Sequence, residues 1–247
     1  APTTFQRLCA GDVGFAPVTL FDVEGRRSRI AAEITGLRVS DVAPRGEAPA
    51  WSRSDALAVG AAREAVRQAG LADGLSLGLA VGATTGGMFE AEDVLASMSE
   101  QAPAESVRRL LAYPLSTSAD HIASGLGNVR RRVTICSACS SGAIALVNSV
   151  AWLHAGQVDA VVAGGTDGLC RLTFAGFNAL GATSTEVCRP FDARRDGLTL
   201  GEGAAFLVLE TEAAARARGA TVLAWLSGFA VAAEAQHITH PQPKDRT

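Results

Sequence analysis

The stretch around Cys139 constrains the fold of this chain more than any other. The β-branched run Val133-Thr-Ile135 follows three polar arginines and predicts a strand that begins at Val133. Residues 137–142 are all small, which lets the backbone turn sharply and lets a ligand come close. From Ala143 to Leu153 almost every residue is apolar, which predicts a helix buried on all sides. The stretch thus predicts a strand, a tight turn and a buried helix with Cys139 at its start.

The predicted position of Cys139 suits a nucleophile. Unpaired backbone N–H groups and the positive end of the helix dipole lie at a helix N-terminus, and both favour the reactive thiolate. The residues alone leave two alternatives open. A free cysteine is often buried as a small hydrophobe. The spacing Cys136-Ser-Ala-Cys139 is also that of a redox or metal pair, although no second close pair supplies further metal ligands.

Length and composition exclude several classes of protein. The 247 residues can bury a substantial core, and 26 glycines with 48% hydrophobic residues suit an α/β protein with tight strand-to-helix turns. The net charge of −3 argues against a nucleic-acid binder, which is normally strongly basic. There is no apolar stretch of membrane-spanning length. Five cysteines, an odd number, fit a reducing compartment, so we expect a cytoplasmic protein in one compact domain with no nucleic-acid or membrane partner.

Helical and strand patterns alternate along the rest of the chain. Expected helices cover residues 5–9, 51–70, 90–98, 105–111, 117–125 and 211–218. Expected strands cover residues 30–34, 77–82, 158–167, 201–210 and a long apolar run at 221–232. The strands on either side of the Cys139 helix form a βαβ crossover. The turn after residue 82 is rich in glycine but lacks the lysine of a phosphate-binding loop, which favours a packing role.

Four ordered motifs resemble those of the β-ketoacyl synthases, the condensing enzymes of fatty acid and polyketide synthesis in the thiolase-like superfamily. They are the nucleophile motif Ser137-Ala-Cys139-Ser-Ser-Gly142, the following strand Gly156–Asp167, the run from Arg189-Pro-Phe-Asp192 through Gly201-Glu-Gly-Ala204, and the pantetheine-proximal segment His237-Ile-Thr239-His-Pro241. The resemblance extends from about Phe5 onward. It implies that an acyl chain is loaded onto Cys139 from acyl carrier protein and joined to malonyl carrier protein by decarboxylative Claisen condensation.

The resemblance also implies roles for single residues. Cys139 is the acyl acceptor, and its backbone N–H contributes to an oxyanion hole. Phe177 gates or lines the acyl pocket, and Thr85 forms part of the pocket wall that sets chain length. Thr239 hydrogen-bonds the phosphopantetheine arm, and His237 holds the segment that carries it. No motif requires a metal or an organic cofactor, because the substrates are carried on the phosphopantetheine of acyl carrier protein.

Other residues at matched positions have expected structural roles or differ from the residue that the family usually has there. Glu202 and Asp192 are expected to form hydrogen bonds and ion pairs that fix loops under the site. Gly181 stands where the family often has a basic residue facing the carrier protein, and Arg171 or Arg63 would have to substitute for it. None of the four histidines stands in the context of the family's catalytic histidines, which belong with a lysine to its second half.

The fold implied by the resemblance is the thiolase-like α/β fold. In that fold two similar halves stack as a five-layered α-β-α-β-α sandwich, and residues 1–247 are expected to give mainly the N-terminal β-ketoacyl synthase domain, without its first strand and its C-terminal half. Residues 117–125 resemble the border of the family's dimer interface. A homodimer, or a heterodimer with a ketosynthase-like chain, is therefore expected.

Three other functions remain alternatives. A related protein could load an acyl group on Cys139 without condensing it. The chain could instead be a scaffold subunit of a ketosynthase heterodimer, although such partners usually lack the active cysteine. A cysteine hydrolase would need a histidine paired with Cys139, and the sequence identifies none.

Overall fold

The computed structural model describes residues 2–98, 104–233, 235 and 237. Its centre is a four-stranded sheet in the order β4-β3-β5-β6. The strands are β3 (Leu77–Gly82), β4 (Val129–Ile135), β5 (Ala160–Asp167) and β6 (Gly203–Glu210). β4, β3 and β5 are parallel, and β6 is antiparallel to β5. β3 and the first residues of β5 are fully buried, as their unbroken apolar runs predict for central parallel strands.

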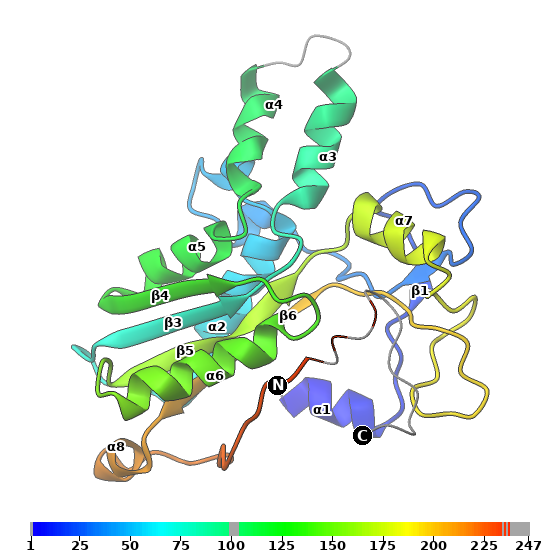
Figure 1. Cartoon of the computed structure of the whole chain (residues 1–247). Helices are drawn as coiled ribbons and strands as arrows, with labels where there is room; N and C mark the ends of the chain where they lie inside the picture. Colours follow the sequence, from blue (N-terminus) through cyan, green and yellow to red (C-terminus); the bar gives the residue numbers. More distant parts are fainter. Residues whose placement is uncertain (1, 99–103, 234, 236, 238–247) are drawn as a thin grey trace.

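Helices cover both faces of this sheet (Figure 1). On one face, α2 (Arg53–Ala69) and α5 (Thr117–Leu126) pack against strand residues that include Leu79, Val81 and Val162. On the other face, α6 (Ser141–His154) packs against residues that include Ala80 and Val161. α6 connects β4 to β5, which confirms the predicted βαβ crossover around Cys139.

The start of α2 shows how the sequence fixes one helix and ties it to the next. The Ser52 hydroxyl accepts a hydrogen bond from the Asp55 N–H at 3.0 Å, and the Asp55 carboxylate accepts one from the Ser52 N–H at 2.8 Å. This capping box satisfies N–H groups that a helix start leaves free. The same buried carboxylate accepts hydrogen bonds from the hydroxyls of Thr117 at 2.9 Å and Ser118 at 2.7 Å. Asp55 therefore joins the starts of α2 and α5.

The remaining elements surround this core. They are α1 (Pro2–Cys9), β1 (Ala16–Pro17), β2 (Ile30–Ala31), α3 (Met88–Ser97), α4 (Ala104–Arg108), α7 (Arg171–Ala179), α8 (Glu212–Ala217) and short 3-10 turns at 39–41, 48–50 and 109–112. α3 and α4 project together from one end of the molecule (Figure 1). A small core that includes Phe21 and Phe174 lies beneath α7. None of the helices in the described residues combines the length and the apolar composition that a membrane span requires.

Two predictions about α6 and β4 need correction. α6 is not buried on all sides, because Ser141, Ala145, Ser149 and Leu153 are its only buried residues. Within the described chain a single sheet covers one face of this helix, so its other apolar side chains are half-buried or exposed. β4 begins at Val129 rather than Val133, so the three arginines lie within the strand.

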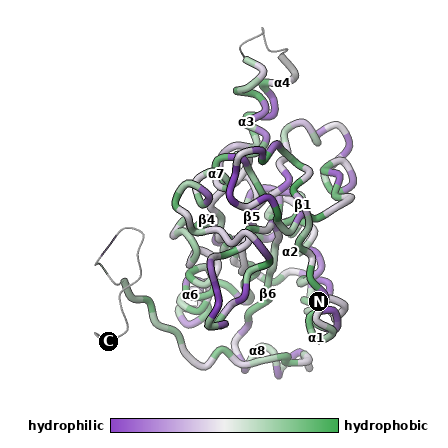
Figure 2. Tube along the Cα trace, turned by 90° about the vertical axis from the view of Figure 1, so that its right-hand side faces the viewer, coloured by the Kyte–Doolittle hydropathy of each residue, from purple (hydrophilic) through white to green (hydrophobic). Residues whose placement is uncertain are grey.

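The predicted strand at 221–232 is wrong. Residues 221–233 form no helix or strand, and their side chains are exposed. Figure 2 shows this hydrophobic segment leaving the body of the fold beyond α8. A strand is stabilised by its hydrogen-bonded neighbours, and no described strand pairs with this segment. Apolar content alone therefore did not make it a strand.

Candidate functional site

Serine hydroxyls hold the turn that carries Cys139. The turn connects the end of β4 to Ser141, the first residue of α6. The Ser141 hydroxyl accepts a hydrogen bond from the Ser137 N–H at 2.8 Å and donates one to the Ala138 carbonyl at 2.7 Å. Ala138 has a φ of +45°, which is unfavourable for a residue with a Cβ. The two bonds of Ser141 compensate for this conformation, so the serine positions the cysteine that follows Ala138.

A close contact between the end of β3 and the start of α6 also fixes the turn that carries Cys139. A Cβ added to Gly82, the last residue of β3, would lie 2.4 Å from the backbone nitrogen of Gly142 and 2.4 Å from the carbonyl carbon of Ser141. Only glycine permits this contact. The end of the central strand therefore presses directly against the first turn of α6, beside the nucleophile.

Cys139 is exposed and lines a cavity of about 830 Å³. Thr85, which follows β3, and Phe177, on α7, line the same cavity. The structure thus brings together three of the five predicted site residues from separate parts of the chain. Their roles in acyl binding remain predictions. Of the other two, His237 is exposed beyond the last element, and Thr239 lies outside the described residues.

Asp167 holds one wall of this cavity. Its carboxylate, at the end of β5, accepts hydrogen bonds from the Thr84 N–H at 2.8 Å and the Thr84 hydroxyl at 2.9 Å. It also accepts bonds from the Thr85 N–H at 2.7 Å and the Thr85 hydroxyl at 2.9 Å. These four bonds join the turn after β3 to the end of β5. The sequence pattern did not reveal this role, although the carboxyl ends of neighbouring parallel strands meet at one edge of a sheet.

A second thiol, that of Cys170, lines the cavity but differs from Cys139 in its environment. Cys170 is buried, and this desolvation raises the pKa of its thiol, because burial disfavours the charged thiolate. The thiol donates a hydrogen bond to the Thr173 hydroxyl at 3.1 Å. Cys170 is therefore held as a neutral group, which leaves Cys139 as the accessible nucleophile among the described cysteines that line this cavity.

Glu202 has the structural role expected from the sequence. Its side chain is fully buried and forms an ion pair with Arg53. It also accepts a hydrogen bond from the Ile34 N–H at 2.9 Å and lies 3.4 Å from the Leu169 nitrogen, which donates to it. These contacts join α2, the loop after β2 and the loop after β5, which borders the cavity.

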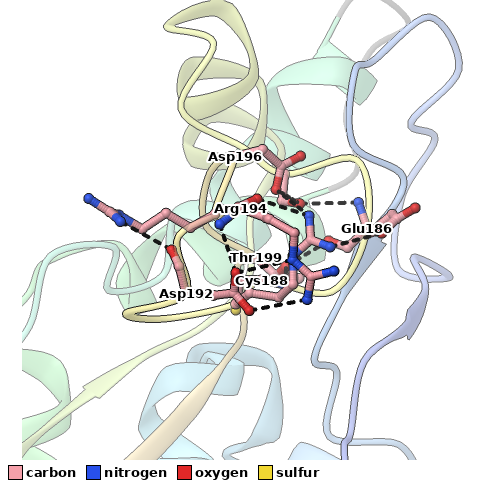
Figure 3. A network of polar contacts seen from close by, with 9 residues as sticks. Glu186, Cys188, Asp192, Arg194, Asp196 and Thr199 are labelled. Atoms are coloured by element: carbon pink, nitrogen blue, oxygen red, sulfur yellow. Dashed lines mark hydrogen bonds and ion pairs between the residues drawn. The ribbon is translucent and has the colours of Figure 1, made fainter.

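Asp192 belongs to a polar loop, which Figure 3 shows folded on itself. Its carboxylate accepts a hydrogen bond from the Arg194 N–H at 2.7 Å, and this bond holds the pKa of Asp192 below its usual value. In the same loop the Cys188 N–H donates to the Thr199 hydroxyl at 3.0 Å (Figure 3). A guanidinium nitrogen of Arg189 lies 3.7 Å from the Asp196 carboxylate. Asp192 therefore stabilises a loop, as expected.

No histidine of the described residues lines the Cys139 cavity. His121, on α5, stacks on Trp51 with ring centroids 3.9 Å apart, and its Nε2 lies 4.0 Å from an Asp55 carboxylate oxygen. His154 is exposed at the end of α6. Among the residues that the structure places, no three His, Cys, Asp or Glu side chains are grouped to hold a metal. Among the described residues the site therefore offers an accessible thiol and a cavity wall, but no histidine that lines the cavity beside the thiol.

Known proteins resemble this chain in sequence and in fold. Residues 3–215 match the family described as Beta-ketoacyl synthase, N-terminal domain. The chain is 36% identical over 231 residues to Nodulation protein E of Rhizobium meliloti, covering 91% of this chain and 57% of that protein. It is 31% identical over 253 residues to 3-oxoacyl-(acyl-carrier-protein) synthase 2 of Staphylococcus aureus, covering 98% of this chain and 63% of that one.

A solved structure agrees with these sequence matches. The ishigamide ketosynthase/chain length factor superposes with a TM-score of 0.81 at 30% identity, covering 90% of this chain and 57% of that chain. The similarity confirms the predicted thiolase-like α/β fold class. The present chain spans about three-fifths of the length of the curated relatives that it matches.

Proposed function

The chain belongs to the β-ketoacyl synthase family, and from this premise we propose that the whole protein is a condensing acyltransferase of fatty acid or polyketide synthesis. An acyl group is loaded onto Cys139 from acyl carrier protein and is then joined to malonyl carrier protein. The observation that carries this proposal is the exposed Cys139, two residues before the start of α6, which lines a cavity of about 830 Å³.

The first step is acyl transfer. The Cys139 sulfur attacks the thioester carbonyl, a new carbon–sulfur bond forms, and the carrier thiol leaves with the proton released from Cys139. The N–H groups at the start of α6 are proposed to stabilise the negative charge on the carbonyl oxygen, because Cys139 directly precedes Ser140, the N-cap residue of this helix. The turn around Ala138 and Ser141 holds the thiol in place for this attack.

The second step is condensation. Loss of carbon dioxide from the malonyl thioester gives a carbanion, which attacks the acyl carbonyl on Cys139 and forms the new carbon–carbon bond. The Cys139 thiolate leaves and is ready for another acyl group. No described histidine lines the cavity, so we assign to the described residues the acyl-accepting half of this chemistry.

Phe177 and Thr85 are the proposed determinants of the acyl chain, because both line the cavity that contains Cys139. Thr239 and His237 are proposed to hold the phosphopantetheine arm. We propose no metal and no organic cofactor, since the thiol and the helix N-terminus supply the groups that acyl transfer needs.

Carrier protein is the proposed macromolecular substrate. The relative named 3-oxoacyl-(acyl-carrier-protein) synthase 2 supports this substrate class. Gly181 cannot bind an acidic surface. Arg171 is exposed but is engaged with Asp93, at 2.8 Å between their charged atoms, whereas Arg63 is exposed on α2. We propose a cytoplasmic protein that acts in a two-chain assembly, and the similarity to the ishigamide ketosynthase/chain length factor supports pairing with a ketosynthase-like chain.

Covalent labelling tests the proposal. The full-length protein is incubated with a cerulenin-like electrophile or with acyl carrier protein bearing an acyl chain, and intact-protein mass spectrometry follows adduct formation. We expect one adduct that maps to Cys139 and is absent from Cys139→Ala. Cys136→Ala is the matched control, because Cys136 is also exposed and lies three positions away; it should retain the adduct.

Two outcomes would contradict the proposal. Labelling that persists in Cys139→Ala would show that Cys139 is not the activated thiol. An acyl adduct on Cys139 without release of carbon dioxide from malonyl carrier protein would identify an acyl-binding protein that does not condense.

A further inference from the structure

A second cavity lies apart from the Cys139 cavity. Its volume is about 510 Å³, and the two cavities share no lining residue. Glu90, in the first turn of α3, and Arg109, the first residue after α4, both line the second cavity. It therefore lies where the projecting helices α3 and α4 join the body of the fold (Figure 1).

Two buried polar side chains of this second cavity have unsatisfied atoms. Trp51 is 4% exposed and Glu90 is 6% exposed, and both line the cavity. Among the described residues, neither the indole Nε1–H of Trp51 nor the Oε2 atom of Glu90 has a hydrogen-bond partner. The other oxygen of Glu90 accepts a bond from the Arg53 N–H at 2.9 Å, which fixes the carboxyl group. Since buried polar groups normally have partners, one donor and one carboxyl oxygen are left for a bound molecule.

The remaining lining of the second cavity suits a small, partly apolar ligand. Val39, Ala48 and Pro49 supply apolar surface. Ser106 also lines the cavity, and its hydroxyl can either donate or accept a hydrogen bond. Pockets for small molecules are typically about 300–1,000 Å³ with a mostly apolar lining and a few polar groups. One ordered water takes up only about 30 Å³, so the cavity has room for a larger occupant.

The charges around the second cavity favour a neutral ligand. Burial raises the pKa of Glu90, and the negative charge of Asp55 acts in the same direction, so an anion would meet unfavourable charge on this side. The guanidinium of Arg109 lines the cavity, held 3.0 Å from the Asp93 carboxylate, and would repel a cation. An ammonium group also has no acceptor for the Trp51 N–H. A neutral group with both an acceptor and a donor satisfies both unpartnered atoms.

We propose that the second cavity binds a small neutral molecule with an apolar part and a polar group that both accepts and donates a hydrogen bond, as a carboxamide or a hydroxyl does. The acceptor bonds the indole N–H of Trp51, and the donor bonds Oε2 of Glu90. The apolar part packs on Val39, Ala48 and Pro49. This is a ligand site separate from the acyl chemistry proposed for Cys139, and its test does not depend on that chemistry.

Three probes with the same branched apolar part but different charge test the proposal. Isobutyramide is neutral, isobutyrate is an anion and isobutylamine is a cation at pH 7. Each is titrated into the full-length protein while NMR follows the indole N–H resonances of Trp51, Trp152 and Trp225. We expect isobutyramide to shift the Trp51 resonance downfield and to leave the other two unchanged. Isobutyrate and isobutylamine should bind at least about fivefold more weakly.

Variants locate the bound probe. Trp51→Phe removes the N–H group but keeps an aromatic ring to stack on His121, and Glu90→Gln places an amide donor where the ligand needs an acceptor. Each should raise the dissociation constant of isobutyramide about fivefold, as measured by NMR relaxation of the probe. Trp152→Phe is the matched control, because Trp152 is half-buried on α6 and lines neither cavity; it should bind like the unaltered protein.

Three results would overturn the inference. A Trp51 resonance that isobutyramide does not shift would show that the second cavity holds only water. Equal or tighter binding of isobutyrate or isobutylamine would show that the site does not select a neutral group. Unchanged affinity in Glu90→Gln would show that the probe does not bond to the carboxyl oxygen. If Trp51→Phe does not fold, the Trp51 resonance of the unaltered protein and the Glu90→Gln affinity still decide the question.

Discussion

At the scale of single residues, Asp167 links the turn after β3 to the end of β5, and Asp167→Asn tests that link. An amide retains the size of the side chain but lacks the charge and one acceptor oxygen, so it cannot keep all four hydrogen bonds to Thr84 and Thr85. We expect a loss of about 1–3 kcal/mol in the free energy of unfolding. We also expect slower acylation of Cys139. Urea denaturation and the rate of adduct formation measure the two effects.

Asp159→Asn is the matched control for this prediction. Asp159 lies just before the first residue of the same strand, where its exposed carboxylate accepts bonds from the Ser76 N–H at 2.7 Å and the Ser76 hydroxyl at 2.8 Å. It does not line the Cys139 cavity. Equal loss of acylation in both variants would mean that Asp167 acts only through general stability.

Glu90 makes stability depend on pH. Burial raises the pKa of its carboxyl group above the usual 4.5, and one of its oxygens has no hydrogen-bond partner among the described residues. Between about pH 4.5 and the raised pKa, the folded protein keeps a proton that the unfolded chain has released. This carboxyl group therefore makes folding less favourable as pH rises through that window.

Glu90→Gln removes this titration. The stability of the variant relative to the unaltered protein should therefore increase as pH rises from 4.5 to 8, as measured by urea denaturation. Glu47→Gln changes an exposed carboxylate and serves as the control. A stability difference that stays constant or falls with rising pH would contradict the assigned effect of burial.

At the scale of elements, the close contact between β3 and α6 depends on Gly82, which has no side chain. Gly82→Ala would force a Cβ to within 2.4 Å of backbone atoms at the start of α6. Since backbone cannot rotate away as a side chain can, we expect a loss of about 1–3 kcal/mol in stability together with much slower labelling of Cys139. Denaturation and labelling rates measure these effects.

Gly60→Ala provides the comparison for this substitution. Gly60 is exposed within α2, and a Cβ there would meet nothing within 4 Å. We expect this variant to gain about 0.5–1 kcal/mol in stability, because alanine favours helix more than glycine does. If Gly82→Ala behaved like Gly60→Ala, the close approach would not be what positions the nucleophile.

The elements show which parts of the fold a sequence encodes locally. β3 was predicted with its observed bounds, because a wholly apolar run between turn signals describes a central parallel strand by itself. The Ser52 cap of α2 and Gly70, which ends this helix with a φ of +57°, likewise act within a few residues of its ends. The segment at 221–232 has a similar apolar content but no strand partner, and pairing is a property that its own residues do not encode.

At the scale of the whole molecule, some features of the site follow from local sequence, and others depend on contacts between residues far apart in the chain. The position of Cys139 between strand and helix followed from local pattern, whereas its shared cavity with Thr85 and Phe177 followed only from the family resemblance. The role of Asp167 was not predicted, because its four hydrogen bonds form only when β3 and β5 lie side by side. α6 was expected to be fully buried because its apolar residues occupy every face, but the burial of those faces depends on what packs against them.

The bonds reported for the Cys139 turn join hydroxyl and backbone groups, and none involves an ionised side chain. Salt and moderate changes in pH should therefore leave the geometry of the turn unaltered. The rate at which Cys139 is labelled should then depend on salt only through the thiol itself, and not through the turn that holds it.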